Sequence, residues 1–228
     1  MRSTRYEMHT QYTPQSNPVG EIIRAYDPGV IKAYCWARFQ ILHQRFLDEI
    51  GQYLPRSGRV LDVGCGFGLF SLYYAKMNPF LDVLGIDLNP LRIQMARTAA
   101  ARLQLSNVHY QVGDVTSYEF QATFDGVYML DIVHHVPRQV VRLLTARLHK
   151  TLRPGCRLII KDVETVPQYK LWWTYVLDKL MDMRSEVSYW EKEELIGLLR
   201  DLNFEVFRHS MVDILPYPHI LYVCQKLG

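Results

Sequence analysis

The sequence predicts an α/β fold, in which a largely parallel sheet carries helices on both faces. From residue 59 onward, short apolar runs alternate with segments of helical spacing, as in strands joined by crossover helices. These runs are almost continuously apolar, which is expected of strands buried on both sides. The last two runs are separated by a short link, so we expect that pair to be antiparallel.

The N-terminal part is expected to be an extension of this core. Residues 1 to about 27 are polar and are expected to form a loose arm. A helical pattern of apolar residues follows Pro28, and the segment LPRSG at 54–58 ends it. We therefore divide the chain into an arm with a cap helix at 1–57 and a core at 58–228.

The elements of the core follow from the pattern in chain order. Strands are expected at 59–63, 82–87, 108–114, 124–130 and 156–163, with helices at 69–77, 90–105 and 138–152. A helix at 166–184, a helix at 191–204 and strands at 204–212 and 219–227 complete the chain. Residues 166–190 thus depart from the simple alternation of strands and helices.

Composition limits the classes of function. An apolar share of 49% is enough for a proper core. The net charge of +3 comes without a basic run, so a nucleic-acid partner is not expected. The cysteines are widely spaced and indicate neither a zinc knuckle nor a disulfide framework. The polar start lacks the apolar part of a secretory signal, and no run approaches the ~20 residues of a membrane helix, so we expect a cytoplasmic protein without a membrane span.

The segment RVLDVGCGFG at 59–68 predicts a ligand site. It leads a strand through Gly64, Gly66 and Gly68 into a helix, and glycine is needed where the backbone turns sharply or approaches a ligand. Ligands of open α/β sheets bind beyond the carboxyl ends of the strands. Asp62 would repel a pyrophosphate but attract an ammonium or sulfonium group, and the segment lacks the lysine of a phosphate-binding loop. These residues therefore favour a cationic ligand.

The next two strands also end in carboxylates. Asp87 follows the glycines by about twenty residues, where an acid can accept hydrogen bonds from ribose hydroxyls, and Leu88 could pack on a flat base. Asp114 could accept from an adenine amino group, with Val115 beside it. Three acids at consecutive strand ends indicate one extended site.

This set of residues resembles the class I S-adenosylmethionine-dependent methyltransferases of the small-molecule type. The resemblance rests on the D-x-G-x-G-x-G segment at 62–68, on Asp87, on Asp114 and on the segment FDGVYMLDIVHHVP at 124–137. It covers roughly residues 55–165. It implies a Rossmann-like, seven-stranded, mostly parallel sheet whose last strand is antiparallel, with an N-terminal helical extension. It also implies a helical, lid-like insertion after strand five, which would be residues 166–190.

The resemblance also implies a cofactor and the residues that bind it. The cofactor is S-adenosyl-L-methionine and the product is S-adenosyl-L-homocysteine. The implied cofactor-binding residues are Asp62, Gly64, Cys65 and Gly66 for the methionine part, Asp87 and Leu88 for the ribose and base, Gly113, Asp114 and Val115 for the adenine, and the backbone of Leu130.

Two histidines directly follow the fourth strand. A hydroxyl acceptor needs a group that takes its proton, and imidazole can do so near neutral pH. We therefore name His134 and His135 as candidate catalytic residues and favour His135. The alternative is that the pair only packs in its loop.

The acceptor pocket is predicted from residues at the same edge. The candidates are Tyr34, Arg38, Asp131, Lys161, Trp172, Tyr217 and His219. Tyr34 and Arg38 could instead lie on a solvated helix face, Lys161 could extend to solvent, and Tyr217 could pack under the loop. The aromatic stripe of 166–184 suits either an apolar chamber or a core. No metal site is expected, because the sequence does not show that Asp131 and Asp162 converge.

We predict a methyltransferase that moves the methyl group to a small-molecule acceptor by in-line displacement. Oxygen is the expected acceptor atom, in an apolar, aromatic or lipid-like or polyketide-like metabolite. One alternative is an RNA or protein methyltransferase, although MLDI stands where an N/D-P-P-Y/F motif would be expected. Others are a non-catalytic, cofactor-binding partner subunit and unusual uses of the cofactor such as cyclopropanation.

Overall fold

The computed structural model describes residues 17–120, 122–163, 190–211 and 219–228. The helices are α1 (Pro18–Arg24), α2 (Val30–Ile41), α3 (Gln44–Gly51), α4 (Leu69–Met77), α5 (Pro90–Arg102), the short 3-10 helix η1 (Val133–His135), α6 (Arg138–Thr151) and α8 (Lys192–Asp201). The strands are β1 (Gly58–Val63), β2 (Leu81–Asp87), β3 (Val108–Val112), β4 (Phe124–Leu130), β5 (Leu152–Val163), β6 (Phe204–Met211) and β7 (His219–Lys226).

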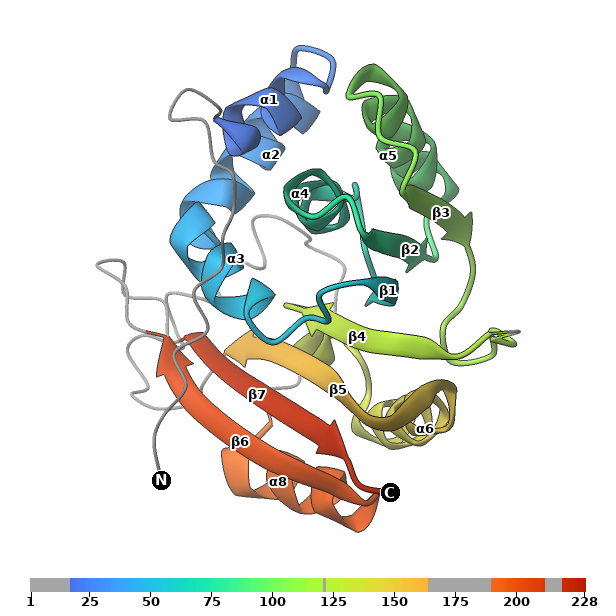
Figure 1. Ribbon diagram of the computed structural model, residues 1–228. Helices are drawn as coiled ribbons and strands as arrows, with labels where there is room; N and C mark the ends of the chain where they lie inside the picture. The colour runs from blue at the N-terminus through green and yellow to red at the C-terminus, as the bar shows by residue number, and fades with distance from the viewer. Residues whose placement is uncertain (1–16, 121, 164–189, 212–218) are drawn as a thin grey trace, which may run out of the picture.

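The strands form one seven-stranded sheet in the order β3-β2-β1-β4-β5-β7-β6 (Figure 1). The first five strands of that order pair in parallel, while β7 is antiparallel to both β5 and β6. The predicted Rossmann-like sheet with its antiparallel last strand is therefore confirmed. The register sets Val63 beside Ile86 and Asp87 beside Val112, so the carboxyl ends of neighbouring strands meet at one edge.

Two hydrophobic cores cover the two faces of this sheet. Helices α1 to α5 lie on one face, which we call the cap face, and α6 and α8 lie on the other (Figure 1). Because side chains alternate along a strand, neighbouring residues enter different cores. Val60 packs into the core of the cap face, whereas Leu61 and Val63 pack into the core under α6 and α8.

Residues 17–57, the described part of the N-terminal extension, contain three helices, which corrects two expectations. Residues 18–24 form α1 instead of a loose arm, because Asn17 accepts from the Gly20 amide at 2.8 Å and Pro18 suits the first helical position. The single helix expected after Pro28 is broken between α2 and α3 at Leu42, whose φ of −111° and ψ of 72° lie outside the helical region. The break allows each short helix to bury its own apolar face.

The extension is fastened to the core by tyrosine hydroxyls. Tyr73 and Tyr74 of α4 donate to the Asp48 carboxylate at 2.6 Å and to the Leu47 carbonyl at 3.1 Å. Tyr26, just after α1, donates to the Phe67 carbonyl in the glycine turn at 2.6 Å. The cap helices therefore lie against both α4 and the turn that precedes it.

Several element boundaries differ from those predicted. Strand β3 ends at Val112, so Gly113 and Asp114 belong to the following loop, and β5 begins at Leu152 instead of residue 156. The helix predicted at 166–184 and the insertion of which it is part lie almost wholly outside the described residues. In the part of the chain that the structure describes, no helix is long and apolar enough to cross a membrane.

Replacing Gly68 by alanine should destabilise the fold. Its φ is +80°, and a Cβ there would lie 2.6 Å from the Tyr110 hydroxyl oxygen and 2.8 Å from the Ala96 Cβ. Strain and overpacking together should lower the free energy of unfolding by about 2–4 kcal/mol, measured by urea denaturation. Gly197→Ala in α8 is the control: its Cβ would meet nothing within 4 Å, so it should stabilise by up to ~1 kcal/mol. Equal stability of wild type and Gly68→Ala would contradict this packing.

Candidate active site

The sharp corner between β1 and α4 is built by three glycines in the left-handed region. Their φ values are +71° for Gly64, +55° for Gly66 and +80° for Gly68, a conformation that other residues rarely adopt. A Cβ on Gly64 would lie 1.9 Å from the Ile132 Cδ1 atom, whereas a Cβ on Gly66 would meet no atom within 4 Å. Gly64 and Gly68 are thus enclosed by protein, and Gly66 faces open space.

Asp87 is held at the edge of that open space by two backbone amides. Its carboxylate oxygens accept from the amide of Gly66 and from the amide of Asn89, each at 2.9 Å. Each oxygen keeps a second lone pair, so the anchored carboxylate can still accept from a ligand hydroxyl. Leu88 follows with 67% of its surface exposed, so its side chain is accessible for packing against the flat base of a ligand.

Asp62 lies beneath the corner instead of in the open space. The carboxylate is buried on the cap face and accepts from the Ser71 hydroxyl of α4 at 2.6 Å. Burial raises its pKa to about 7, although the Ser71 hydrogen bond opposes the shift. Asp62 would therefore act on a ligand through its charge, from behind the glycine backbone, and not by direct contact.

The loop after β3 closes the other end of the open space. Asp114 is exposed and accepts from the Thr116 hydroxyl at 2.7 Å and the Thr116 amide at 2.8 Å, which lowers the pKa of its carboxyl. Val115 is buried, and the Gly113 amide donates to the Asp87 carbonyl at 3.0 Å. The ends of β2 and β3 are thus tied together.

The remaining predicted cofactor residues are Cys65, in the turn after β1, and Leu130, the last residue of β4. Cys65 is buried inside the corner, where burial raises the pKa of its thiol well above the ordinary value. Leu130 is buried at the end of β4, directly before a residue of unusual conformation.

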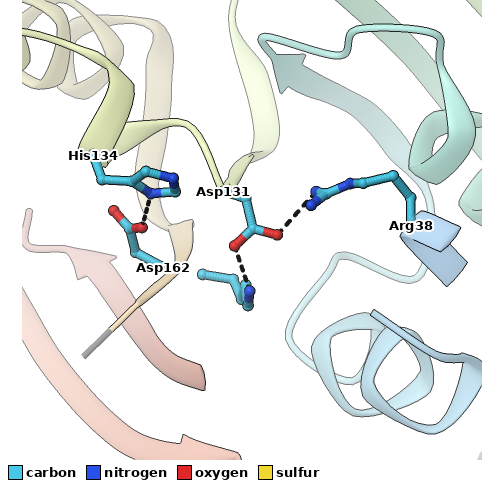
Figure 2. Close-up of polar contacts among 5 residues, drawn as sticks. Arg38, Asp131, His134 and Asp162 are labelled. Carbon is cyan, nitrogen blue, oxygen red and sulfur yellow. Dashed lines mark hydrogen bonds and ion pairs between the residues drawn. The ribbon is translucent and has the colours of Figure 1, made fainter. Parts of the chain in front are cut away.

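That residue is Asp131, which joins two cationic side chains. Its φ is +56°, and its carboxylate pairs with Arg38 of α2 at 2.9 Å and with Lys161 of β5 (Figure 2). Burial alone would raise the pKa of Asp131, but the charges of Lys161 and Arg38 overcome it and hold the pKa well below its usual range. The carboxylate therefore stays ionised in the buried site.

Lys161 and His219 lie next to this carboxylate on the cap face. Lys161 is 0% exposed, and burial lowers the pKa of its ammonium despite the neighbouring carboxylate. His219 packs its ring 4.8 Å from that of Phe46, and burial beside Lys161 lowers its pKa to about 2. His219 is thus uncharged at neutral pH and packs against the charged cluster.

The two candidate histidines differ in their surroundings. His134 is 1% exposed and its Nδ1 atom pairs with Asp162 (Figure 2). His135 is only half-buried, and its ring centroid lies 4.1 Å from that of His134. Burial and the neighbouring His134 lower the pKa of His135 to about 4, while Asp131 and Arg38 lie near enough to influence it. His135 is therefore a neutral imidazole at pH 7.

The predicted acceptor residues do not gather in one place. Arg38, Asp131, Lys161 and His219 form the buried cluster on the cap face. Tyr34 packs on Phe67 of the glycine turn with ring centroids 5.1 Å apart, so it lies on the cofactor side. Trp172 and Tyr217 lie outside the described residues.

Sequence reasoning missed several residues of this site. Ile132, which fills the space above Gly64, carries no motif. Asp162 was considered for a metal site, and its pairing with His134 was not predicted. The alternation of side chains along the strand could have indicated that Lys161 and Asp162 point to opposite faces of the sheet. Within the described ranges, no group of three or more histidine, cysteine or acidic side chains could hold a metal ion. Asp131 and Asp162 pair instead with Arg38, Lys161 and His134.

Comparison with known proteins agrees with this geometry. A family model described as a methyltransferase domain matches residues 60–155, which contain the glycine corner, Asp87, Asp114 and the histidine pair. The protein is similar to phosphoethanolamine N-methyltransferase 3 of Arabidopsis thaliana, with 34% identity over 165 residues that make up 71% of this chain and 31% of that protein. It is also similar to the ubiquinone biosynthesis O-methyltransferase of Xylella fastidiosa, with 35% identity over 51% of this chain and 47% of that one.

The chain thus spans less than half of each of these curated relatives. Among solved structures, magnesium protoporphyrin IX methyltransferase from Synechocystis, with bound S-adenosylhomocysteine, shares the fold with a TM-score of 0.66. That match covers 91% of this chain and 94% of the other, at 19% identity. Residues 60–155 thus match the methyltransferase-domain family, and the chain has the fold of solved S-adenosylmethionine-dependent methyltransferases.

Proposed function

We propose that this protein transfers a methyl group from S-adenosylmethionine to a hydroxyl oxygen of a small molecule. The observation that carries the proposal is the open glycine corner at Gly66, flanked by the amide-anchored carboxylate of Asp87. A backbone that can be approached closely, beside an acceptor for ribose hydroxyls, fits a nucleoside with a cationic side chain.

The residues present suit this cofactor along its whole length. The carboxylate of Asp87 would hold the ribose, Leu88 would pack against the base, and the loop at 113–115 would meet the far side of the base. The buried Asp62 would stabilise the positive charges of the methionine part through the turn. When bound, the cofactor supplies an electrophilic methyl carbon on a sulfonium leaving group, so the chain has to align the acceptor and exclude water.

The names of the relatives support a small acceptor. They include O-methyltransferases of ubiquinone synthesis and of rifamycin. The first one named above acts on phosphoethanolamine nitrogen, which makes an amine the second candidate. An apolar acceptor chamber, as predicted from the aromatic stripe at 166–184, is part of the proposal.

His135 is the proposed proton acceptor. Residues 161 and 162 alternate along β5, so Asp162 and its partner His134 turn toward the core under α6 and α8. His135 is more exposed than the buried His134, so its imidazole is the more accessible of the two to a ligand. In this arrangement His134 anchors the turn, and the neutral imidazole of His135 takes the hydroxyl proton while the oxygen attacks the methyl carbon. The positive charge lost by the sulfonium then appears on the imidazolium.

Isothermal titration of ligand-free protein with S-adenosylmethionine and S-adenosylhomocysteine tests the proposal, with Gly66→Ala as the variant. The wild type should bind both ligands with micromolar affinity. Gly66→Ala should keep its fold at a cost of about 1–2 kcal/mol, since its Cβ meets no protein atom, but should bind either ligand at least tenfold more weakly. No binding to folded wild type would refute the cofactor assignment.

Asp62→Asn should separate the charge of Asp62 from its packing. The native pKa of about 7 lies above the ordinary 3.8, so the native state binds the proton more tightly than the unfolded state between these values. Wild-type stability should fall as pH rises from about 4 to 7, by up to ~1.4 kcal/mol for each pH unit. The variant should lose this slope in urea denaturation and also bind the cofactor more weakly. A retained slope would place the buried proton elsewhere.

His135→Gln should reduce the turnover number about 100-fold and leave S-adenosylhomocysteine affinity unchanged. Because its pKa is about 4, the wild-type imidazole is protonated below that pH and can accept a proton above it. The turnover number should therefore be flat above about pH 5 and fall toward pH 4. His134→Gln, the matched control, should lower stability more than turnover; the opposite order would make His134 the proton acceptor.

A screen by mass spectrometry identifies the acceptor class. Caffeic acid would serve as a hydroxyl probe and phosphoethanolamine as an amine probe, each with S-adenosylmethionine. A mass gain of one methyl group on the hydroxyl probe alone supports O-methylation. Methylation of only the amine would establish the second candidate instead.

A further inference from the structure

We propose that Arg38 and Asp131 are positioning residues for methyl transfer: their ion pair fastens cap helix α2 to the end of β4 and so closes the cap over the cofactor edge. The inference rests on the proposed function. It differs from the expectation that Arg38 lines the acceptor pocket, because here the arginine acts through the protein.

The pair joins the N-terminal extension to the sheet edge beside the glycine corner. Arg38 lies in α2 of the extension, and Asp131 directly follows β4, which pairs with β1. Their side chains are 13% and 4% exposed, so the contact at 2.9 Å is largely desolvated. The Arg38 guanidinium also lies 5.7 Å from the centre of the Phe70 ring of α4, which fixes its direction.

The backbone of Asp131 explains why its carboxylate needs to be held. A φ of +56° is uncommon outside glycine and stores strain of about 1–3 kcal/mol. This conformation turns the chain so that Ile132 packs against Gly64 and the histidine turn follows at once. Lys161 from the sheet and Arg38 from the cap hold the carboxylate from two sides. The position of the cap and the shape of the glycine corner are therefore linked through one residue.

A second cap contact lies at the other end of the corner. Tyr26 donates to the Phe67 carbonyl at 2.6 Å, and Tyr34 packs on the Phe67 ring. The segment from Tyr26 to Arg38 thus runs from the glycine turn to the end of β4, across the edge where the cofactor is proposed to lie. Of these contacts, the Arg38 ion pair joins the cap to the segment between β4 and the histidine turn η1.

Arg38→Gln is the decisive variant, because Asp131 keeps Lys161 as its partner and the fold should persist. We expect its melting temperature to stay within a few degrees of wild type. S-adenosylhomocysteine should dissociate at least about tenfold faster in stopped-flow measurements, and α2 amides should lose the protection from hydrogen exchange that the ligand gives in wild type. Arg38→Lys should recover part of the slow dissociation.

Arg24→Gln is the matched control, since Arg24 is an exposed arginine in the last turn of α1. It should leave dissociation and exchange unchanged. Wild-type dissociation in Arg38→Gln would overturn the inference. That result is distinct from failure of the proposed function, in which the wild type itself would not bind S-adenosylhomocysteine.

A charge-balanced double variant separates positioning from simple neutralisation. Asp131→Asn keeps the shape of the side chain, and asparagine tolerates a positive φ. The substitution removes the carboxylate that accepts a hydrogen bond from the buried Lys161, so the single variant should be less stable than wild type. Adding Lys161→Met should recover stability while dissociation stays fast, because the ion pair between Arg38 and residue 131 is still missing. Recovery of both properties would make Asp131 only a counter-ion of Lys161 and refute its positioning role.

Discussion

The turn of the chain between β1 and α4 is the constraint on which the rest of the site depends. Three left-handed backbone conformations within five residues are tolerable only for glycine, and two of the three leave no room for a side chain. Tyr110, Ala96 and Ile132 fill the space around Gly64 and Gly68, so protein packing fixes the corner from outside. Gly66 alone faces outward, and the Asp87 carboxylate binds its amide. A rigid corner with one open position is what a ligand edge requires.

Strand alternation then divides the charged residues beyond β4 and β5 into two groups. Lys161 faces the cap and meets Asp131, while its neighbour Asp162 faces the opposite core and meets His134. At this edge of the sheet, the His134–Asp162 pair therefore anchors the histidine turn on one face, and the Asp131 ion pairs hold the cap on the other. This division explains why two adjacent histidines, alike in sequence, differ in burial and in partners.

The fold was predictable because it follows from local patterns. Apolar periodicity locates the strands and helices, and parallel strands bring Asp62 and Asp87 to one edge, whereas the position of Asp114 depends on the loop after β3. The contacts of the cap were not predictable. The break at Leu42 and the helix at Pro18–Arg24 depend on tertiary packing and a single capping residue. The pairing of Arg38 with Asp131 joins residues 93 positions apart, and nothing in their local sequence indicates it.

Electrostatics connects the stability of the site with its ligand. The buried Asp62 carboxyl is held near half protonation at neutral pH by desolvation, so its ionised form is a cost to the empty fold. A ligand that brings positive charge to the corner lowers that cost, because an opposite charge favours the ionised carboxyl. Cofactor binding should then release a proton and strengthen as pH rises through the native pKa. The buried, ionised Asp62 carboxylate thus lowers the stability of the ligand-free protein, and a bound cationic ligand offsets that loss.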